Sequence, residues 1–437
     1  MGIRKCSTHA TGFGAVTTAL TLLFLVLSCF WATRAQAIAA FSREYKTECT
    51  TCHTIFPQLN EFGEAFEKNG FIWPGAVPLS KKVKVAQTEE ERKSAEFIHL
   101  SGIPATLPLS ASLGVSYLYD DTKEDDFDQK FFSAQILSGG AFGGDRIGFW
   151  FNESLGNQDT TRTNSLSGPS QVYFIARHPL GIPVHLKAGR FSPDLSLWKT
   201  SLSGRLISMG ANIDGFTVTG AQSGLELSSF LGPRVLAVVG VNDRNNSADA
   251  KNPHSVNDVY GRVGVKIGGA DYHGKEPDVD LDKDSVWDYL SVSLSAFGYS
   301  GSSSKGDGVD HDVTRLGLEA GVNYKKLLLM FGATFGDNDQ SAGWGVAADK
   351  DTELKSTALS AEVNYVFNAK YAAALRYDYL DVDGKDLRTI VTPAVIYAPL
   401  QSFKLRLSVA IDSNPTSAAT DKAESNTTAS LSATLSF

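Results

Sequence analysis

The sequence contains few cysteines, and after residue 37 it has no long hydrophobic run. Its 437 residues include four cysteines, and Cys6 and Cys29 lie in the first 37 residues. The remaining pair, Cys49 and Cys52, has no second pair to complete a zinc site and lacks the surrounding strands and helices of a thioredoxin-like fold. No apolar run after residue 37 reaches the roughly 20 residues of a membrane-spanning helix. Nucleotide-binding loops and Ser/His/Asp signatures in a credible context are also missing, so no hydrolase is suggested.

The first 37 residues have the pattern of a secretory signal peptide. Arg4 and Lys5 give a positive start, residues 17–33 are apolar, and Ala35-Gln36-Ala37 offers a cleavage site between small residues. A first transmembrane helix is the alternative, but the apolar stretch is short for a span and a cleavage site follows it. The pattern favours export and removal of residues 1–37.

The chain is acidic. Its formal net charge is −8, and because the leader carries three basic residues and no acidic one, residues 38–437 carry −11. An acidic exported protein is poorly suited to bind nucleic acid or anionic membrane surfaces, so we expect no nucleic-acid partner. The charge suits cations and metal-bearing partners.

From about residue 111 to residue 437 apolar and polar residues alternate. Segments such as 111–119, 371–379 and 429–437 place apolar side chains on one face only. Many long strands of this kind are typical of a mainly β fold, a transmembrane antiparallel β-barrel whose strands show every second residue to lipid. We predict about 16 strands, or 18 if residues 206–218 contain two more. Both totals are even, as in bacterial outer-membrane barrels.

The lengths of the connections predict an orientation. Those near residues 324–325, 368–369 and 399–400 are short, whereas those over 337–356 and 412–426 are long and polar. Short periplasmic turns and long outer loops produce this asymmetry. We therefore expect a porin-like barrel in the lipid of the outer membrane. A soluble sandwich also alternates, but it does not need so many long strands or a terminal phenylalanine.

The remaining cysteines form the motif Cys49-Thr50-Thr51-Cys52-His53, which has the spacing of a c-type haem attachment site. In such a site two thiolates add to the haem vinyl groups and the adjacent imidazole becomes the proximal iron ligand. A lone cysteine pair in an oxidising compartment is otherwise a redox disulfide or a metal pair. His53 directly after Cys52 favours haem. The sequence thus predicts one covalent haem c bound by Cys49, Cys52 and His53, with His53 on the iron.

The motif lies in residues 38–75, a predicted monohaem cytochrome c segment that residues 76–110 link to the barrel at 111–437. A helix is expected after Phe56-Pro57 and a stop at Asn69-Gly70. The apolar stripe between them fits a haem face or an ordinary small core equally well, and comprises Leu59, Phe62 and Phe66. A glycine within this helix, Gly63, allows a porphyrin or a backbone segment to approach closely.

Five short stretches carry a family resemblance: Ala40-Phe41-Ser42-Arg43, Cys49-x-x-Cys52-His53, Phe56-Pro57-Gln58-Leu59-Asn60, Phe62-Gly63 and Asn69-Gly70-Phe71. They resemble the fused outer-membrane monohaem cytochrome c–porin family of iron-oxidising bacteria. Ser42 departs from the alanine expected before the arginine. The resemblance is specific over about 38–75, and over the barrel it concerns architecture, size and order only.

This resemblance implies a one-electron oxidoreductase that takes electrons from extracellular Fe(II) and passes them to a periplasmic carrier such as a soluble cytochrome. Electron transfer of this kind needs no catalytic acid or base. One alternative is outward electron transfer to minerals or electrodes. Another is an anion or solute porin in which the haem-bearing segment is a plug or sensor.

The sixth iron ligand is predicted less directly. The nearest downstream histidine is His99, just before the first strand, and we expect a bis-His site through it. His185, a lysine or an open position are the alternatives. Because about 38 residues cannot form a full core, the haem is expected to use walls of the barrel interior.

Two further groups of charged residues are candidates. Asp278, Asp280, Asp282 and Asp284 alternate in one connection, where they form either a Ca²⁺ or Fe²⁺ site or a solvated acidic loop. Basic residues in and near the strand at 187–190 are candidates to line the lumen and select anions, namely Arg177, Lys187 and Arg190.

Overall fold

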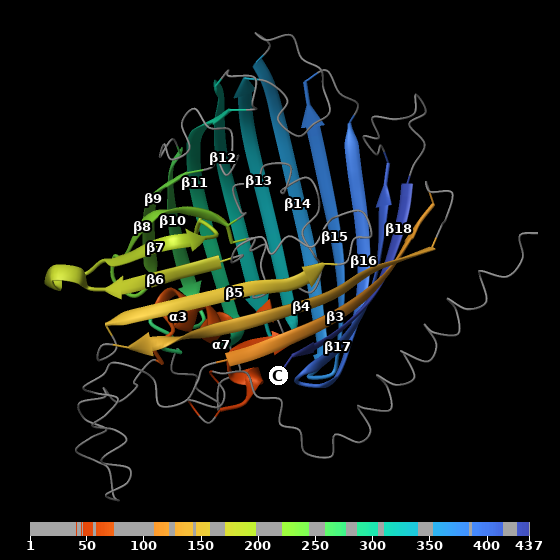
Figure 1. Ribbon diagram of the computed structural model, residues 1–437, viewed down its shortest axis with the longest axis horizontal. Coiled ribbons are helices and arrows are strands. Elements are labelled where there is room, and N and C mark those ends of the chain that lie inside the picture. Colours follow the sequence, from red (N-terminus) through yellow and green to blue (C-terminus); the bar gives the residue numbers. More distant parts are fainter. Residues whose placement is uncertain are drawn as a thin grey trace, which may run out of the picture. The chain divides into compact units, whose positions relative to one another are not determined.

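Sixteen strands of the described part of the chain form one closed antiparallel barrel (Figure 1). The computed structural model describes residues 41, 45, 47–55, 58–73, 109–121, 127–142, 146–157, 171–197, 221–243, 258–276, 286–304, 310–339, 353–383, 387–413 and 426–436. The barrel strands are β3 (Leu109–Asp120), β4 (Phe127–Phe142), β5 (Ile147–Asn157), β6 (Gln171–Arg177), β7 (His185–Phe191), β8 (Gln222–Phe230), β9 (Val235–Asp243), β10 (Asp258–Gly268), β11 (Leu290–Ser304), β12 (Asp310–Tyr324), β13 (Leu327–Asp339), β14 (Glu353–Asn368), β15 (Tyr371–Val382), β16 (Arg388–Leu400), β17 (Phe403–Asp412) and β18 (Asn426–Ser436).

Each barrel strand pairs with its neighbour in the sequence, and β18 pairs with β3 to close the ring. At this closure Leu435 lies opposite Leu113 and Ser432 opposite Ser116. The predicted fold and the count of about 16 strands are confirmed for the described residues. Residues 206–218, where two more strands were considered, lie outside the described residues.

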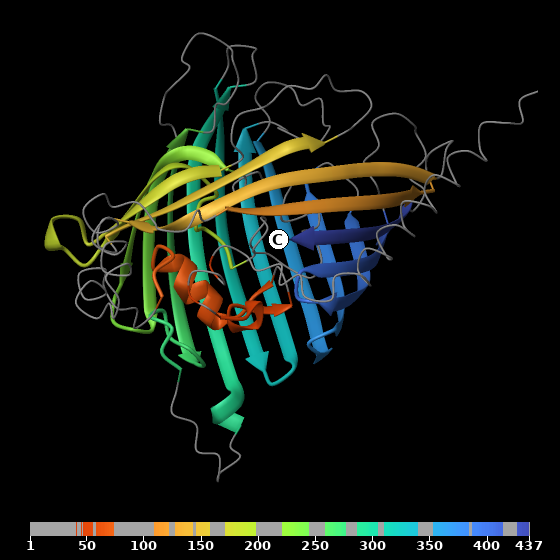
Figure 2. The same cartoon turned by 60° about the horizontal axis from the view of Figure 1, so that its bottom comes forward.

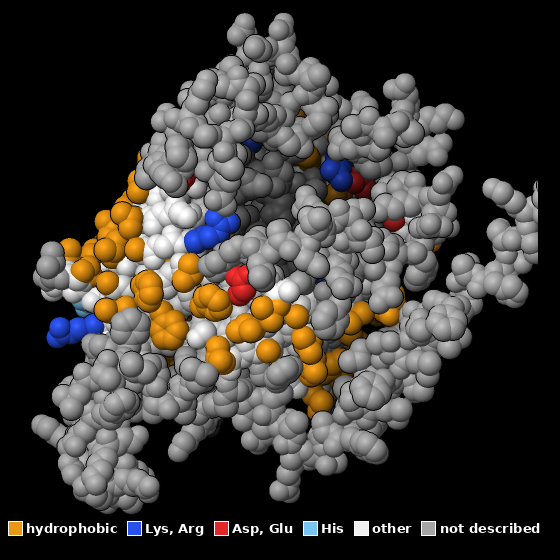
Figure 3. Space-filling model, in the orientation of Figure 1, with side chains coloured by type: hydrophobic (Ala, Val, Ile, Leu, Met, Phe, Trp, Pro, Cys, Tyr) orange, Lys and Arg blue, Asp and Glu red, His pale blue; other side chains and the backbone are white. Residues whose placement is uncertain are grey.

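The strands turn apolar side chains outward and polar ones toward the lumen. In β10, Val259, Val263 and Ile267 are 58%, 51% and 50% exposed, while the alternate residues Tyr260 and Arg262 are buried. A soluble protein would lose stability from such a surface, whereas a barrel in lipid requires it. Figure 3 shows apolar side chains gathered over the outer faces of β3 to β5 on the visible side.

Aromatic residues gather on the outer face near the short turns. Tyr371 stacks on Tyr397 at 4.9 Å between ring centroids, and Tyr365 and Phe367 lie 4.9 Å apart on the adjacent strand. A girdle of this kind marks the membrane interface of an outer-membrane barrel. Together with the apolar outer surface, it makes the chain an outer-membrane β-barrel protein. Within the described part of the chain no helix is long and apolar enough to cross a membrane.

The short connections that the sequence predicts are two-residue turns. They consist of Lys325-Lys326, Ala369-Lys370 and Gln401-Ser402. This end of the barrel is periplasmic in bacterial outer-membrane proteins. The centres of the two long connections, residues 340–352 and 414–425, lie outside the described residues, as do Asp278, Asp280, Asp282 and Asp284. Two short helical elements complete the barrel, η2 (Pro179–Gly181) between β6 and β7 and α7 (Val286–Tyr289) before β11.

The N-terminal segment consists of η1 (Cys49–Thr51), β1 (His53–Ile55), β2 (Gln58–Leu59) and α3 (Glu61–Lys68). Its helix begins later than expected, because Gln58–Leu59 pairs with β1 and the side chain of Asn60 caps the helix by accepting a hydrogen bond from the Gly63 backbone N–H. The predicted stop at Asn69-Gly70 is confirmed, with Gly70 at a φ of 75°. Figure 2 shows this segment inside the ring of strands.

Candidate functional site

The motif Cys49–His53 is a tight turn followed by a short strand. Its 3₁₀ turn is closed by a hydrogen bond of 3.1 Å from the Cys52 backbone N–H to the Cys49 carbonyl oxygen, and His53 begins β1. Neither cysteine is in a disulfide, and both are half-buried. The three predicted cofactor-binding residues therefore lie on one short stretch. The fourth predicted ligand, His99, lies outside the described residues.

Burial affects one of these thiols strongly. The pKa of the Cys52 thiol is raised from 9.0 to about 11, first because burial disfavours the thiolate and second because Cys49 lies close to it. A raised pKa keeps the thiol protonated at neutral pH, so Cys52 is a poor nucleophile without an added base. This environment argues against a redox-active cysteine pair of the low-pKa kind.

Asn60 and Gly63 brace the turn from behind. The backbone N–H of Asn60 donates to the Cys52 carbonyl oxygen at 2.9 Å, and its side-chain amide donates to the carbonyl oxygens of Thr50 and Thr51 at 3.3 and 3.0 Å. A β-carbon on Gly63 would overlap that same Cys52 carbonyl oxygen. The predicted close approach at Gly63 is thus made by backbone, and α3 is held directly against the motif.

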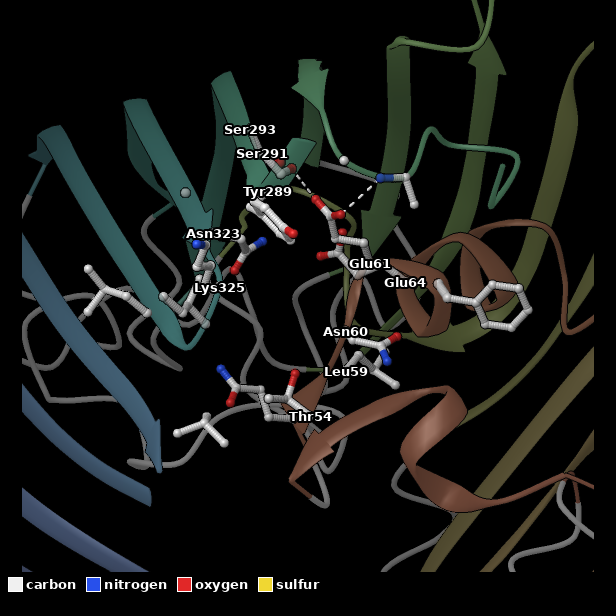
Figure 4. Close-up of a pocket in the computed structure, with 18 of the residues that line it drawn as sticks. Thr54, Leu59, Asn60, Glu61, Glu64, Tyr289, Ser291, Ser293, Asn323 and Lys325 are labelled. Atoms are coloured by element: carbon white, nitrogen blue, oxygen red, sulfur yellow. Dashed lines mark hydrogen bonds between the residues drawn. The ribbon is translucent and has the colours of Figure 1, made fainter. Parts of the chain in front are cut away.

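The acidic first turn of α3 is bound to the barrel wall (Figure 4). The Glu61 carboxylate accepts hydrogen bonds from the Ala270 backbone N–H, at 2.9 Å, and from the Ser291 hydroxyl. One helical turn later, Glu64 lies 3.3 Å from the Lys266 ammonium group. These contacts tie the helix to the ends of β10 and β11. Acidic residues in a first turn also favour the helix dipole.

The last turn of α3 is bound to a second part of the barrel. Lys68 pairs with Asp194 at 2.5 Å, and Arg262 donates to the other oxygen of the same carboxylate at 2.6 Å. The side-chain amide of Asn69 donates to the Tyr272 carbonyl oxygen at 2.7 Å. Asp194 lies in the connection after β7, so this connection turns into the lumen and meets the N-terminal segment there.

Aromatic rings fill the space between the segment and the wall of β5 and β6. Phe71 stacks on Trp150 at 5.4 Å, and Phe41 lies 5.0 Å from Phe66 and 5.4 Å from Phe71. Tyr173 continues the cluster from β6. Buried aromatic pairs stabilise by about 0.5–1.5 kcal/mol each beyond the burial of their area. The segment is therefore fixed by apolar packing as well as by ion pairs.

The motif itself touches the opposite wall. The backbone N–H of Cys49 donates to Gln401 Oε1 at 3.2 Å, and the Gln401 amide donates to Glu48 at 3.5 Å. Ile55 packs in a buried cluster of apolar wall residues, Ala372, Ala374, Ala394, Ile396 and Ala398. The start of the segment thus rests on β15, β16 and the turn that leads into β17.

A cavity of about 540 Å³ lies between the segment and the wall of β11 to β14. Its lining includes Thr51 and Thr54 from the motif region and Met330 from the wall, but not Cys49, Cys52 or His53. Thr54 lines this cavity, whereas the next residue, Ile55, packs against β15 and β16. The volume is within the range of cofactor sites, about 300–1,000 Å³, but the predicted haem-binding residues do not face it.

The other candidate residues are distributed along the lumen. His185 is buried, with Nδ1 3.3 Å from the Lys68 carbonyl oxygen, at the end of α3 far from the motif. Lys187 is paired with Glu226 at 2.5 Å, which compensates its charge. Arg190 follows Lys187 by three residues, and because side chains alternate along a strand it lies on the other face of β7. No group of three His, Cys, Asp or Glu side chains within the described ranges could hold a metal ion.

Several residues that position the site were not predicted. The Asn60 cap had a signal in the sequence, because an asparagine followed by Glu61 and Glu64 is typical of a helix start. The pairing of Lys68 with Asp194 had no signal in the sequence, since the two residues are 126 positions apart.

Comparisons with known proteins support the barrel. No family model and no curated protein matches the chain. An anion-selective porin from Comamonas acidovorans is 13% identical and covers 76% of this chain and 99% of its own, with a TM-score of 0.54. Salmonella typhi OmpF, in a complex with daunomycin, is 11% identical and covers 76% and 97%, with a TM-score of 0.53. The outer-membrane channel DcaP of Acinetobacter baumannii is 13% identical and covers 75% and 96%, with a TM-score of 0.50. At such identity the likeness establishes a porin-like fold.

Proposed function

We propose that this chain is an outer-membrane electron-transfer protein, a porin-like barrel that carries one covalent haem c on its N-terminal segment. The observation that supports this most is the attachment of the Cys49–His53 segment to the barrel interior. Ion pairs at Glu64 and Lys68 and the hydrogen bonds of Glu61 hold α3, and α3 holds the motif. A cofactor attached there would have a fixed position inside the lumen.

The donor set fits haem c. Two cysteines and an imidazole lie within five residues, and the two thiols are not joined in a disulfide. A haem bound in this way supplies reversible one-electron chemistry at its iron. Cys49 and Cys52 would hold the porphyrin edge and His53 the iron. Asn60 and Gly63 would keep the turn in one orientation.

We propose extracellular Fe(II) as the electron donor and a periplasmic carrier such as a soluble cytochrome as the acceptor. The resemblance of residues 38–75 to fused cytochrome–porins supports this choice. The segment lies at the end of the barrel with the short turns, where a periplasmic carrier has access. The lumen would give small cations a route past about 30 Å of hydrocarbon. Outward transfer to minerals or electrodes uses the same geometry with partners of different potential.

The test starts from protein made in cells competent for cytochrome c maturation and purified in detergent. We expect the mass of one haem per chain in wild type, and none when Cys49→Ser and Cys52→Ser are combined. Anaerobic addition of Fe(II) to the oxidised protein should produce sharp reduced c-type bands. Reduction by dithionite alone would point to another donor or to outward transfer. A wild-type chain without haem would refute the proposal.

For the sixth iron ligand we propose His99. The visible spectrum of a His99→Ala variant should lose its low-spin character, whereas His185→Ala should keep it. His185 is a suitable control because it contacts the end of α3 far from the motif. Loss of the low-spin spectrum in His185→Ala alone would reverse the assignment.

The second candidate function is an anion or solute porin with a haem-bearing plug. It is favoured by the porin-like fold and by the N-terminal segment inside the ring of strands. Reconstitution in a planar bilayer distinguishes the two. Steady conductance of the intact protein would favour the porin. Conductance that appears only after the contacts of Lys68 and Glu61 are removed would favour a closed electron conduit.

A further inference from the structure

Two lumen-facing cations on β17 have no acidic partner in the part of the chain that the structure describes. Lys404 and Arg406 alternate with the lipid-facing residues Leu405 and Leu407, so both point to the lumen. Lys404 is 8% exposed, and the buried Arg406 Nε atom has no hydrogen-bond partner. No ion pair joins either of them to an acid within the described residues. They lie two residues apart on one strand, about 7 Å along its axis.

Three other buried cations of the described barrel are compensated by a neighbouring acid. Lys187 pairs with Glu226 at 2.5 Å, Arg262 with Asp194 at 2.6 Å, and Arg376 with Asp378 at 2.8 Å. This is the usual arrangement, because an uncompensated buried charge costs several kcal/mol. Lys404 and Arg406 therefore indicate an anion that the described side chains do not supply.

On the side of β18 and β3, the wall beside the two cations is built from small side chains. Ser432 lies opposite Arg406 on β18, and Thr434 lies opposite Lys404. On the next strand, β3, Ser116 lies opposite Ser432 and Gly114 opposite Thr434. These residues offer hydroxyl groups and space, but no carboxylate.

This wall continues the surface that the motif touches. Gln401, which accepts a hydrogen bond from the Cys49 backbone N–H, belongs to the turn that leads directly into β17. Ile55, two residues after His53, packs against the neighbouring β15 and β16. The start of the segment, which carries His53, thus rests directly beside the wall that contains Lys404 and Arg406.

We propose that Lys404 and Arg406 bind the two propionate carboxylates of the haem attached at Cys49 and Cys52. The inference rests on the proposed function, and it assigns positioning residues that the motif does not reveal. Haem c has two carboxylates on the edge of its porphyrin, and this wall has two unpaired cations. Charge-assisted bonds from arginine or lysine to carboxylate are among the strong hydrogen bonds in proteins.

The experiment measures the midpoint potential of the purified holoprotein as a function of pH. The variants are Lys404→Gln and Arg406→Gln, with Lys404→Arg as the conservative change. Lys370→Gln is the control, because it removes the same charge from an exposed turn at the same end of the barrel. Heat-modifiable migration verifies that each barrel is folded, and pyridine haemochrome spectra verify that haem is attached.

We expect the glutamine variants to have a lower midpoint potential than wild type, because an unpaired carboxylate favours ferric over ferrous iron. Their potential should also change more steeply with pH near neutrality, since loss of the cation raises the pKa of the propionate. Lys404→Arg and Lys370→Gln should behave as wild type.

The outcomes separate the two proposals. Equal potentials in all variants that carry haem would overturn the propionate contact and leave the proposed function standing. Equal potentials together with a loss of anion selectivity in bilayers would assign Lys404 and Arg406 to free carboxylates passing through the lumen, which also overturns it. A wild-type protein that attaches no haem would reject the proposed function itself.

Discussion

The carbonyl oxygen of Cys52 occupies the space that a β-carbon on Gly63 would need. The same oxygen accepts a hydrogen bond from the Asn60 backbone N–H at 2.9 Å. The motif Cys49–His53 and the first turn of α3 are therefore in backbone contact, without a side chain between them. Any change that lengthens this contact moves Cys49, Cys52 and His53 away from their wall.

A Gly63→Ala substitution should release the motif from α3. The added methyl group overlaps the Cys52 carbonyl oxygen and comes within 2.9 Å of the Leu59 side chain. Overpacking of this kind costs about 1–3 kcal/mol. We expect faster protease cleavage of the N-terminal segment and a lower yield of attached haem, in a barrel that still folds.

Gly298→Ala is the matched control, because its nearest neighbour to an added β-carbon is Leu316 Cδ2 at 3.5 Å. It should leave cleavage and haem yield unchanged. Equal protection of the N-terminal segment in Gly63→Ala and wild type would contradict the backbone contact.

Two substitutions at Asn60 should separate its two roles. Asn60→Asp keeps the oxygen that accepts from the Gly63 N–H but loses the amide that donates to the Thr50 and Thr51 carbonyl oxygens. Asn60→Ala loses both, with a cost for the cap of about 0.5–2 kcal/mol. Hydrogen exchange should therefore accelerate in residues 49–52 for both variants, and in α3 for Asn60→Ala alone. Acceleration of α3 in Asn60→Asp would show that the cap depends on the amide.

The barrel could be predicted because the alternation of apolar and polar residues within each strand identifies its lipid-facing and lumen-facing sides. Val259, Val263 and Ile267 alternate with lumen residues whatever their partners are, so periodicity alone identifies a strand in lipid. Contacts between distant residues are of another kind. The sequence around Lys68 does not predict its ion pair with Asp194. The sequence around Lys404 does not predict that Gln401 contacts the motif. Both contacts depend on the register of the strands and on the closure of the barrel.

At the start of α3, one local signal favoured an earlier helix and another favoured a short strand before it. Phe56-Pro57 suggested a helix, but the pairing of Gln58–Leu59 with β1 gives those residues an extended conformation. Asn60 then begins the helix as a cap. The stop at Gly70 was predictable since its left-handed conformation favours glycine.

Cys52 should alkylate slowly in haem-free protein. With its pKa raised to about 11, its thiolate fraction at pH 8 is about 0.1%, against roughly 10% for an unshifted thiol. The reaction rate should rise about tenfold per pH unit up to about pH 11. Peptide mapping after timed iodoacetamide treatment measures it.

Denaturant provides the control for Cys52, because unfolding removes the burial that raises the thiol pKa. The rate at pH 8 should then increase by one to two orders of magnitude, roughly the change in thiolate fraction. A Cys49→Ser variant should also react somewhat faster, since Cys49 contributes the smaller part of the shift. Fast alkylation of the folded wild type at pH 8 would show that Cys52 is not buried.

Asp194 should matter more than Lys68 for holding α3. Its carboxylate is shared by Lys68 at 2.5 Å and Arg262 at 2.6 Å. Lys68→Met leaves the Arg262 pair intact, whereas Asp194→Asn leaves two mostly buried cations without their anion. Breaking a buried pair from one side costs about 3–5 kcal/mol. Protease cleavage of the N-terminal segment in heat-modifiable barrels should therefore be fastest in Asp194→Asn and intermediate in Lys68→Met.

The double variant of Lys68→Met and Asp194→Asn tests the sharing directly. Removing Lys68 from a chain that already lacks the Asp194 charge also removes an unpaired cation, so cleavage should be no faster than in Asp194→Asn alone. Asp412→Asn is the control, because it breaks the pair with Arg388 at the other end of the barrel. It should leave the segment protected. If Asp412→Asn exposed the segment as much as Asp194→Asn, general loosening of the barrel would explain both, and the anchoring role of Asp194 would be lost.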